Sequence, residues 1–509
     1  MTLVAEKIAE KIERLSPLLI WAAVLMTLLL VPLAITGLGY LPGDDALRHA
    51  AKAVSGRPWS EIVVQRPGVD IDHHAAWHSF LARIHASTDC GADGLVVFAV
   101  VVLFLLVFLA PLWAFRRPEA WLALWVGAMV SGFHIERFLF GRPYLVSVAA
   151  MLAIMSIWTR FKPATKKSLA AVVFASTLLM FLAAWIHGSW YLLAIIPAGF
   201  FFAKQWRACW WLSLSWGLGS LLAGLASGSP FAFLYGQVFH TLHAMGDSKF
   251  VWLKVSEFQP SGGGGLPAVV WLAFSGIQIA CAADRKRAAR ETLESPLFMI
   301  AALGWLLGLK VTRFWIDWGM PCALLWMALQ LEKLLIAWHP SNSTRLAACL
   351  AVCLAFAFQA TADNGGRWTQ GLRREFIDVE GEGMAGWMPD DGGVIYSTSM
   401  GVFYNTFFKY PHAKWKYLLS FEPAMMPPDD HKTYNHIRWN AGDPRAFKPW
   451  LDKMRPQDRL IIEGASGSEP KIPELEWHYG ATGLWIGRLP LRTGLREASS
   501  AKVGRRRPG

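Results

Sequence analysis

Long runs of apolar residues, separated by short polar segments, occupy the first 360 positions of the chain. About 20 apolar residues in a helix span the hydrocarbon core of a bilayer. The pattern therefore predicts a polytopic α-helical membrane protein with about eleven transmembrane helices, near 17–36, 95–115, 119–133, 144–159, 168–187, 190–203, 208–226, 265–283, 296–310, 318–338 and 346–362. The segments 119–133 and 190–203 are short, which is typical of tilted, broken or partly re-entrant helices.

The N-terminal segment Met1 to Ser16 carries apolar side chains on one side and predicts a separate amphipathic helix on the cytoplasmic surface. Lys7, Lys11 and Arg14 precede the first apolar run, and no small-residue cleavage site clearly follows it. The run is therefore expected to be a retained anchor rather than a removed signal peptide.

Basic residues indicate how the predicted helices are oriented, because Lys and Arg are enriched in cytoplasmic loops. With a cytoplasmic N-terminus, every expected inner loop is basic: Arg116/Arg117, Arg160/Lys162/Lys166/Lys167, Lys204/Arg207, Arg285/Lys286/Arg287/Arg290 and Lys333/Arg345. The outer face then receives 37–94, 134–143, a turn near 188, 227–264, 311–317 and the chain from about Asp363. The net charge of +12 thus fits membrane orientation and not nucleic-acid binding, and we predict a multi-pass protein of the cell inner membrane.

Composition agrees with this class of protein. Hydrophobic residues make up 54% of the chain, and five of its six cysteines lie in or beside apolar runs. Neither a disulfide nor a zinc site of the CxxC type is therefore predicted. The transmembrane domain is expected to cover 1–362, followed by a periplasmic α/β domain at 363–490 and a disordered basic tail at 491–509. Within 363–490 the predicted strands are 394–397, 415–419, 459–463, 477–479 and 484–487, and the predicted helices are 400–408 and 445–454.

Asp44 and Asp45 follow the first apolar run directly, and carboxylates at the mouth of a membrane helix are costly to place there. They either cap a helix over 46–55, since Asp is favoured at helix N-termini, or provide an acidic active-site residue at the membrane surface. Farther along the same loop, imidazole and carboxylate side chains suited to Zn²⁺ or Mn²⁺ gather at Asp70, Asp72, His73, His74 and His78. The alternative is that these groups simply line a wet loop.

The second outer loop places His134, Glu136, Arg137 and Arg142 within ten residues. Its arginines either bind a lipid phosphate through paired N–H groups or anchor the loop among headgroups. Glu257 precedes the glycines 262–265, a hinge that would let its carboxylate swing over a site.

Arg313 and Asp317 stand four residues apart at an outer helix end, where they either pair or leave Arg313 to contact phosphate. All these charged clusters fall on the same predicted face. A transporter would instead place such charges near the midplane of its spans.

With these charged loops, the chain resembles glycosyltransferases of the GT-C superfamily. Its segment Gly43-Asp-Asp-Ala-Leu-Arg-His49, followed by Ser55-Gly-Arg-Pro-Trp59, resembles the first loop of bacterial members, with the superfamily's acidic motif. Lys254-Val-Ser-Glu-Phe-Gln-Pro260 is similar to the SVSE-type segment of oligosaccharyltransferase catalytic subunits, and the segment 312–321 resembles their late helix that carries an Arg for the lipid pyrophosphate. The WWDYG acceptor motif is missing, and the second loop has His134 and Glu136 where an acidic pair is expected.

The resemblance implies an inverting transfer of a hexosyl or pentosyl group from a polyprenyl phosphate or pyrophosphate to a glycan, lipid or protein acceptor at the outer face. Asp44 or Asp45 would be the catalytic base, and Arg313 with Arg137 or Arg142 would bind the donor phosphate. The acceptor or a divalent cation, Mg²⁺ or Mn²⁺, would be held by residues among Glu136, Glu257, His134, His73 and His74. The alternatives are a polysaccharide polymerase or ligase of the same membrane, and a transporter or flippase without catalysis.

Overall fold

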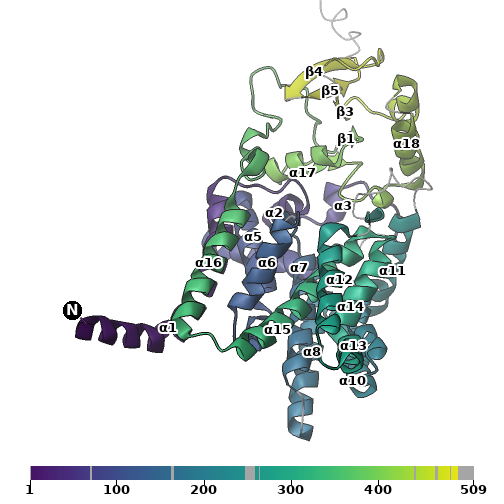
Figure 1. Ribbon diagram of the computed structural model, residues 1–509. Helices are drawn as coiled ribbons and strands as arrows, with labels where there is room; N and C mark the ends of the chain where they lie inside the picture. Colours follow the sequence, from purple (N-terminus) through teal and green to yellow (C-terminus); the bar gives the residue numbers. More distant parts are fainter. Residues whose placement is uncertain are drawn as a thin grey trace, which may run out of the picture. The chain divides into compact units, whose positions relative to one another are not determined.

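The structure is a computed structural model that describes residues 2–68, 72–133, 135–161, 165–246, 258–262, 264–440, 443–464, 468–481 and 483–490, with side chains from residue 13 on except at 240 and 243–246. The chain forms two compact units, coloured along the sequence in Figure 1. The larger is helical and comprises Met1–Val54 and Ile71–Arg374. The smaller contains a β-sheet and comprises Ser55–Asp70 together with the chain from Glu375.

Apolar helices dominate the helical unit. Within the described residues, six helical segments are long and apolar enough to cross a membrane, so the chain is a multi-pass membrane protein. The six segments are Glu13–Gly37 of α1 (Thr2–Gly37), Ala92–Ala114 from α5 (Ala92–Leu109) and η1 (Leu112–Ala114), α8 (Lys166–His187), α10 (Trp206–Ala226), Phe314–Trp338 from η6 (Phe314–Gly319) and α15 (Met320–Trp338), and α16 (Asn342–Thr361). Five apolar helical segments are shorter: α6 (Glu119–Val130), α7 (Tyr144–Arg160), η3 with α9 (Trp190–Ala194 and Ile195–Phe202), α12 (Gly265–Ala280) and α14 (Pro296–Gly308). Each predicted apolar segment overlaps one of these helices. That all eleven cross the bilayer, and in which direction, stays a prediction.

Two elements of the helical unit differ from the sequence prediction. The predicted surface helix and first span form one continuous helix, α1, with Pro17 and Pro32 inside it. The predicted outer loop 227–264 contains a further helix, α11 (Pro230–Gly246). Its backbone bonds are satisfied internally although glycine and polar residues interrupt its apolar pattern.

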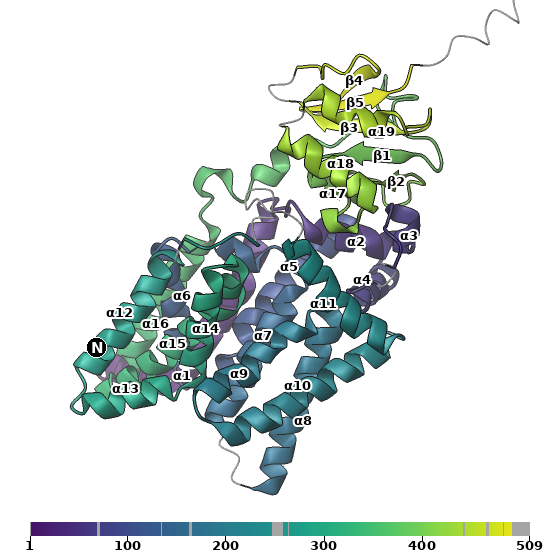
Figure 2. The same cartoon turned by 90° about the vertical axis from the view of Figure 1, so that its right-hand side faces the viewer.

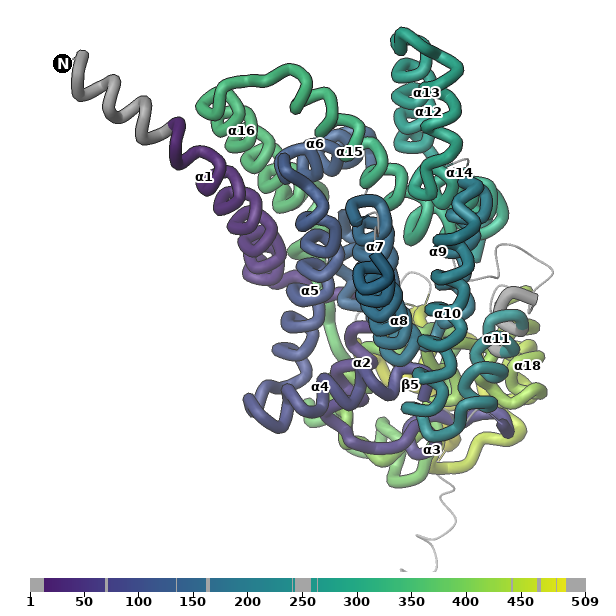
Figure 3. The backbone as a smooth tube through the Cα atoms, turned by 90° about the horizontal axis from the view of Figure 1, so that it is seen from below, coloured from purple at the N-terminus to yellow at the C-terminus, as the bar shows by residue number. Residues whose placement is uncertain are grey.

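The remaining helical elements connect the apolar helices: α2 (Asp45–Ser55), α4 (Ala75–Thr88), η2 (Ile135–Phe138), α13 (Arg285–Leu293), η7 (Asn364–Gly366) and η8 (Gln370–Arg373). Figure 3 shows α1 running beside α16, and α7 and α8 lie next to each other. Helix α14 approaches η6 so closely that a Cβ added at Gly304 would lie 2.5 Å from the Cα of Gly319. Such contacts between small residues let helix backbones pack directly in a membrane protein.

Buried carboxylates secure the ends of α6, α15 and α16, where the sequence predicts cytoplasmic loops. The Glu332 carboxylate accepts hydrogen bonds from the backbone N–H groups of Arg116 (2.6 Å) and Arg117 (2.7 Å). Arg345 donates to the Glu119 carboxylate at 2.6 Å, and the Glu119 side chain is only 7% exposed. Arg345, one of the basic residues of the predicted inner loops, therefore also connects α16 to α6.

The smaller unit is built on a five-stranded mixed sheet with strand order β2-β1-β3-β5-β4 (Figure 2). Its strands are β1 (Val394–Ser397), β2 (Lys416–Tyr417), β3 (Arg459–Glu463), β4 (Glu476–Ala481) and β5 (Leu484–Arg488). β1 pairs in parallel with β2 and β3, whereas β5 is antiparallel to β3 and β4. The α/β character and all five predicted strands are confirmed.

Helices cover both faces of this sheet. Trp450 of α19 (Lys448–Leu451) packs on Tyr396, in a core that also includes α18 (Pro428–Trp439) and η10 (Pro444–Phe447). On β2, Tyr417 instead contacts Phe403 and Phe407 of α17 (Met400–Lys409). The segment with α3 (Trp59–Ile62), which the sequence analysis left in the first loop, joins this unit through Val64, whose N–H donates to the Tyr417 carbonyl at 2.9 Å. The short helix η9 (Pro423–Met425) completes the unit.

Candidate active site

The acidic pair after α1 is held by arginine. Asp44 precedes α2 and accepts a bidentate ion pair from Arg142, with 3.2 Å between Nε and Oδ1. The same Nε lies 3.6 Å from Asp45, in the first turn of α2, and Asp45 also accepts from Arg48 at 2.6 Å. Both aspartate side chains remain 24% exposed. Arg142 therefore orients a carboxylate pair that other molecules can still reach.

A buried phenol, that of Tyr40, is affected by the charges of this polar group. Burial raises the pKa of Tyr40, and the nearby carboxylates of Asp44 and Glu136 raise it further, while Arg142 and Arg374 oppose them. Charged residues from three separate loops therefore act on the Tyr40 hydroxyl. Arg374 also donates to the carbonyl of Pro42 at 3.0 Å, which fixes the turn before Asp44. The Glu136 carboxylate lies 3.6 Å from Arg367.

A second cluster joins two arginines through one carboxylate. Asp317, only 1% exposed, accepts two hydrogen bonds of 2.8 Å from Arg137 and one of 3.0 Å from Arg313. It lies in η6, a π-helical turn, which is a distortion often found at functional sites. Tyr144 supports the cluster: its ring lies 4.6 Å from the Arg137 guanidinium and 5.5 Å from that of Arg313. The predicted Arg313–Asp317 pair thus forms, but within a triad of net charge +1.

A cavity of about 520 Å³ reaches the second cluster at Arg137. Glu136 and Arg137 line it together with Trp315, and the glycine-containing segment 259–267 forms another part of its wall, except for the undescribed residue 263. Trp315 donates to the Gly264 carbonyl at 3.2 Å, and Gly264 has a φ of +82°, a conformation that favours glycine. The cavity wall is therefore partly aromatic and carries one charge of each sign, Glu136 and Arg137.

Histidines of the predicted metal loop form a cluster with His49. His78 lies 2.6 Å from Asp72 and 2.8 Å from His49, and the rings of His49 and His74 are 4.9 Å apart. Burial lowers the pKa of His49, His74 and His78, and it lowers that of His73 to about 4. Burial raises the pKa of Asp72, but His78, the backbone of His74 and Lys52 together lower it more, so the net shift is downward.

No group of three potential metal ligands occurs among the described residues. His134, Glu257 and Asp70 lie outside the described residues. The structure does bring Asp44, Asp45, Glu136 and Arg142 into one polar group, whereas His73 and His74 belong to the histidine cluster.

Sequence reasoning did not single out Tyr40, Tyr144, Arg367 and Arg374. Two of them carried a usable signal, because Arg367 and Arg374 follow the last apolar run on the same predicted face as the other arginines. The two tyrosines carried none, since an aromatic residue near a helix end is ordinary at a membrane interface.

Comparison with known proteins assigns the fold. The chain has a fold similar to that of solved archaeal oligosaccharyltransferase structures. It superposes on the archaeal oligosaccharyltransferase AglB of Archaeoglobus fulgidus, solved with an inhibitory peptide and a dolichol-phosphate, with a TM-score of 0.52 and 13% identity over 86% of this chain and 69% of that one. The Archaeoglobus fulgidus oligosaccharyltransferase tethered to an acceptor peptide gives 0.50 and 13% over 86% and 68%. No protein-family model and no curated protein matches the sequence.

Proposed function

We propose that the protein transfers a sugar from a polyprenyl phosphate or pyrophosphate to an acceptor, with inversion, at the outer face of the inner membrane. One observation carries this proposal: the loop that begins at η2 connects both charged clusters. Arg142 holds Asp44, and Arg137, five residues earlier, holds Asp317 beside the cavity. A proton acceptor and a phosphate-binding cluster therefore share one short segment.

The chemistry assigned to these residues is a single displacement. The acceptor hydroxyl attacks the anomeric carbon, the bond from that carbon to the phosphate oxygen breaks, and Asp44 takes the hydroxyl proton. The phosphate leaves with the bonding electron pair. Arg137 and Arg313 stabilise its growing negative charge, since arginine fits phosphate geometry and the triad with Asp317 has a net charge of +1.

The cavity is the proposed site of the donor headgroup. Its volume of about 520 Å³ is within the range of small-molecule sites, and Arg137 and Glu136 lie in its wall. Glu136, and Glu257 by sequence alone, are proposed to orient the acceptor. The dolichol-phosphate and peptide named with the archaeal structure support a lipid-linked donor and a separate acceptor as the substrates to test.

Purified Asp44→Asn and Asp45→Asn variants with a labelled lipid-phosphate sugar test the assignment. Loss of the base is expected to slow transfer by about 10²–10⁴-fold in Asp44→Asn. Asp45→Asn is the matched control, since it removes the neighbouring charge and leaves the Asp44–Arg142 contact in place. Full turnover in both variants refutes the catalytic role of this pair.

Two other outcomes would point to the alternative functions. Loss of activity in Arg313→Ala, with both aspartate variants active, favours a polymerase or ligase that uses a lipid pyrophosphate glycan. Substrate counterflow in proteoliposomes without a new glycosidic bond favours a transporter.

A further inference from the structure

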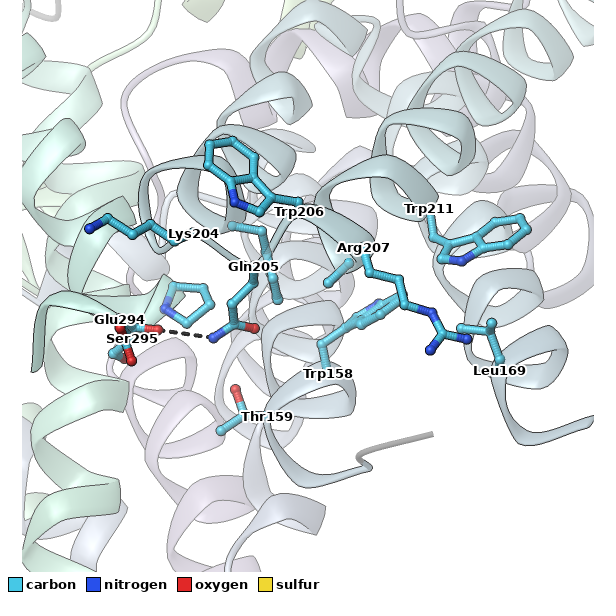
Figure 4. A pocket seen from close by; sticks show the side chains of 13 residues that line it. Trp158, Thr159, Leu169, Lys204, Gln205, Trp206, Arg207, Trp211, Glu294 and Ser295 are labelled. Carbon is cyan, nitrogen blue, oxygen red and sulfur yellow. Dashed lines mark hydrogen bonds between the residues drawn. The ribbon is translucent and has the colours of Figure 1, made fainter. Parts of the chain in front are cut away.

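A second cavity lies in the helical unit, at the helix ends where the sequence predicts the cytoplasmic face. Its volume is about 860 Å³. The end of α7, the beginnings of α8, α10 and α14 and the turn after α9 enclose it, and Figure 4 shows the side chains that line it. None of these residues belongs to the candidate active site. The cavity therefore requires an explanation of its own.

The charge of the cavity wall is positive. Lys204 and Arg207 line it, and in the part of the chain that the structure describes neither is within ion-pair distance of a carboxylate. The acidic residue in the wall, Glu294, is already engaged: its side chain accepts from Arg290 at 2.7 Å, and its carbonyl accepts from Gln205 at 2.9 Å (Figure 4). Among the residues that the structure describes, Lys204 and Arg207 thus have no protein counter-charge, and an anionic ligand would supply one.

The backbone at Lys204 departs from what its residue type favours. After α9, Lys204 donates its N–H to the Phe201 carbonyl and Gln205 donates to that of Phe200, a turn that ends many helices. That turn normally places glycine at this position, but Lys204 occupies it with a φ of +58°. The chain therefore holds a lysine at the cavity where glycine would fit with less strain.

The aromatic surroundings indicate where the ligand comes from. Trp206 and Trp210 lie in the first turns of the apolar helix α10 and are 57% and 69% exposed. Trp206 lines the cavity together with Trp158 and Trp211. Exposed tryptophans at the end of an apolar helix are typical of the level of the lipid headgroups. At that depth, the anions present at high local concentration are the phosphates of lipids.

We propose that this cavity binds the headgroup of an anionic phospholipid. Lys204 and Arg207 pair with its phosphate, while the tryptophans contact the glycerol region and the first part of the acyl chains. Basic pockets between membrane helices bind lipid headgroups in this manner. By the predicted orientation the lipid belongs to the cytoplasmic leaflet.

The test measures lipid retention by the full-length protein after delipidation in detergent. Phosphatidylglycerol and phosphatidylcholine with identical acyl chains are titrated, and occupancy is read by native mass spectrometry and by the shift in Tm. The wild type is expected to bind phosphatidylglycerol preferentially. Removing two interfacial cations in Lys204→Gly/Arg207→Ala is expected to weaken this binding roughly 30-fold.

Controls separate lipid binding from folding and from general charge. Lys204→Gly alone relieves the strained backbone, so it should be at least as thermally stable as the wild type while it binds the lipid more weakly. Arg285→Ala/Lys286→Ala removes the same charge from the exposed part of α13 and should leave binding unchanged. The proposal is overturned if the cavity variants bind phosphatidylglycerol as the wild type does. It is equally overturned if phosphatidylcholine binds as tightly, or if sodium phosphate alone produces the same stabilisation.

Discussion

Asp317 offers the sharpest test of how the candidate site is assembled. Its carboxylate, 1% exposed, is the common partner of Arg137 and Arg313, whose side chains are 12% and 21% exposed. In the proposed mechanism it does not touch the reacting atoms. It positions the two guanidinium groups. Asp317→Asn keeps the shape of the side chain and removes the charge.

The expected cost follows from this burial. Breaking a buried ion pair from one side costs about 3–5 kcal/mol, because the remaining charge is left uncompensated. For a unit of this size that corresponds to a fall in Tm on the order of 5 °C. The released guanidinium groups would also lose their geometry, and a displacement of about 1 Å in a positioning group can reduce kcat/KM by about 10²-fold.

A matched control separates the two effects. Glu119→Gln breaks the Glu119–Arg345 pair, whose carboxylate is also buried, at a place outside the candidate site. Both variants should lose a similar amount of thermal stability, measured by the fraction of monodisperse protein after heating in detergent. Only Asp317→Asn should raise the KM for the lipid-linked donor. Equal donor kinetics in the two variants would refute the positioning role.

The remaining predictions concern packing and pH. Gly304→Ala forces a Cβ against the backbone of Gly319, so it should lower Tm and weaken donor binding. The control Gly276→Ala, with nothing within 4 Å of the added Cβ, should leave both unchanged. Equal Tm values in the two variants would contradict the close packing. Burial depresses the pKa of His49 and His78 in the folded protein. Below about pH 6.5 the unfolded chain therefore binds more protons than the folded one. The free energy of unfolding should be constant above this pH and fall as the pH decreases below it. His49→Gln should reduce this pH dependence of Tm, and an unchanged profile would exclude His49 as its source.

The sequence determined the features that depend on local pattern. Apolar runs of sufficient length predicted the positions of the membrane helices, because a backbone in lipid must satisfy its own hydrogen bonds. Alternating and β-branched segments likewise predicted strands β1 and β3 with their observed bounds. Helix α11 was missed since Gly236 and Gln237 interrupt the apolar pattern of that segment.

For the candidate site, the sequence identified which loops carry charge but not how the charges pair. Tertiary structure alone joined Arg142 to Asp44 across 98 positions and Arg137 to Asp317 across 180. No periodicity encodes such contacts, because they depend on how separate helices pack, including the π-helical turn η6 that carries Asp317. The acidic pair after the first helix was visible as a pattern. That Arg142 orients it, and that the same loop reaches the second cluster, was decided by the packing of the helices.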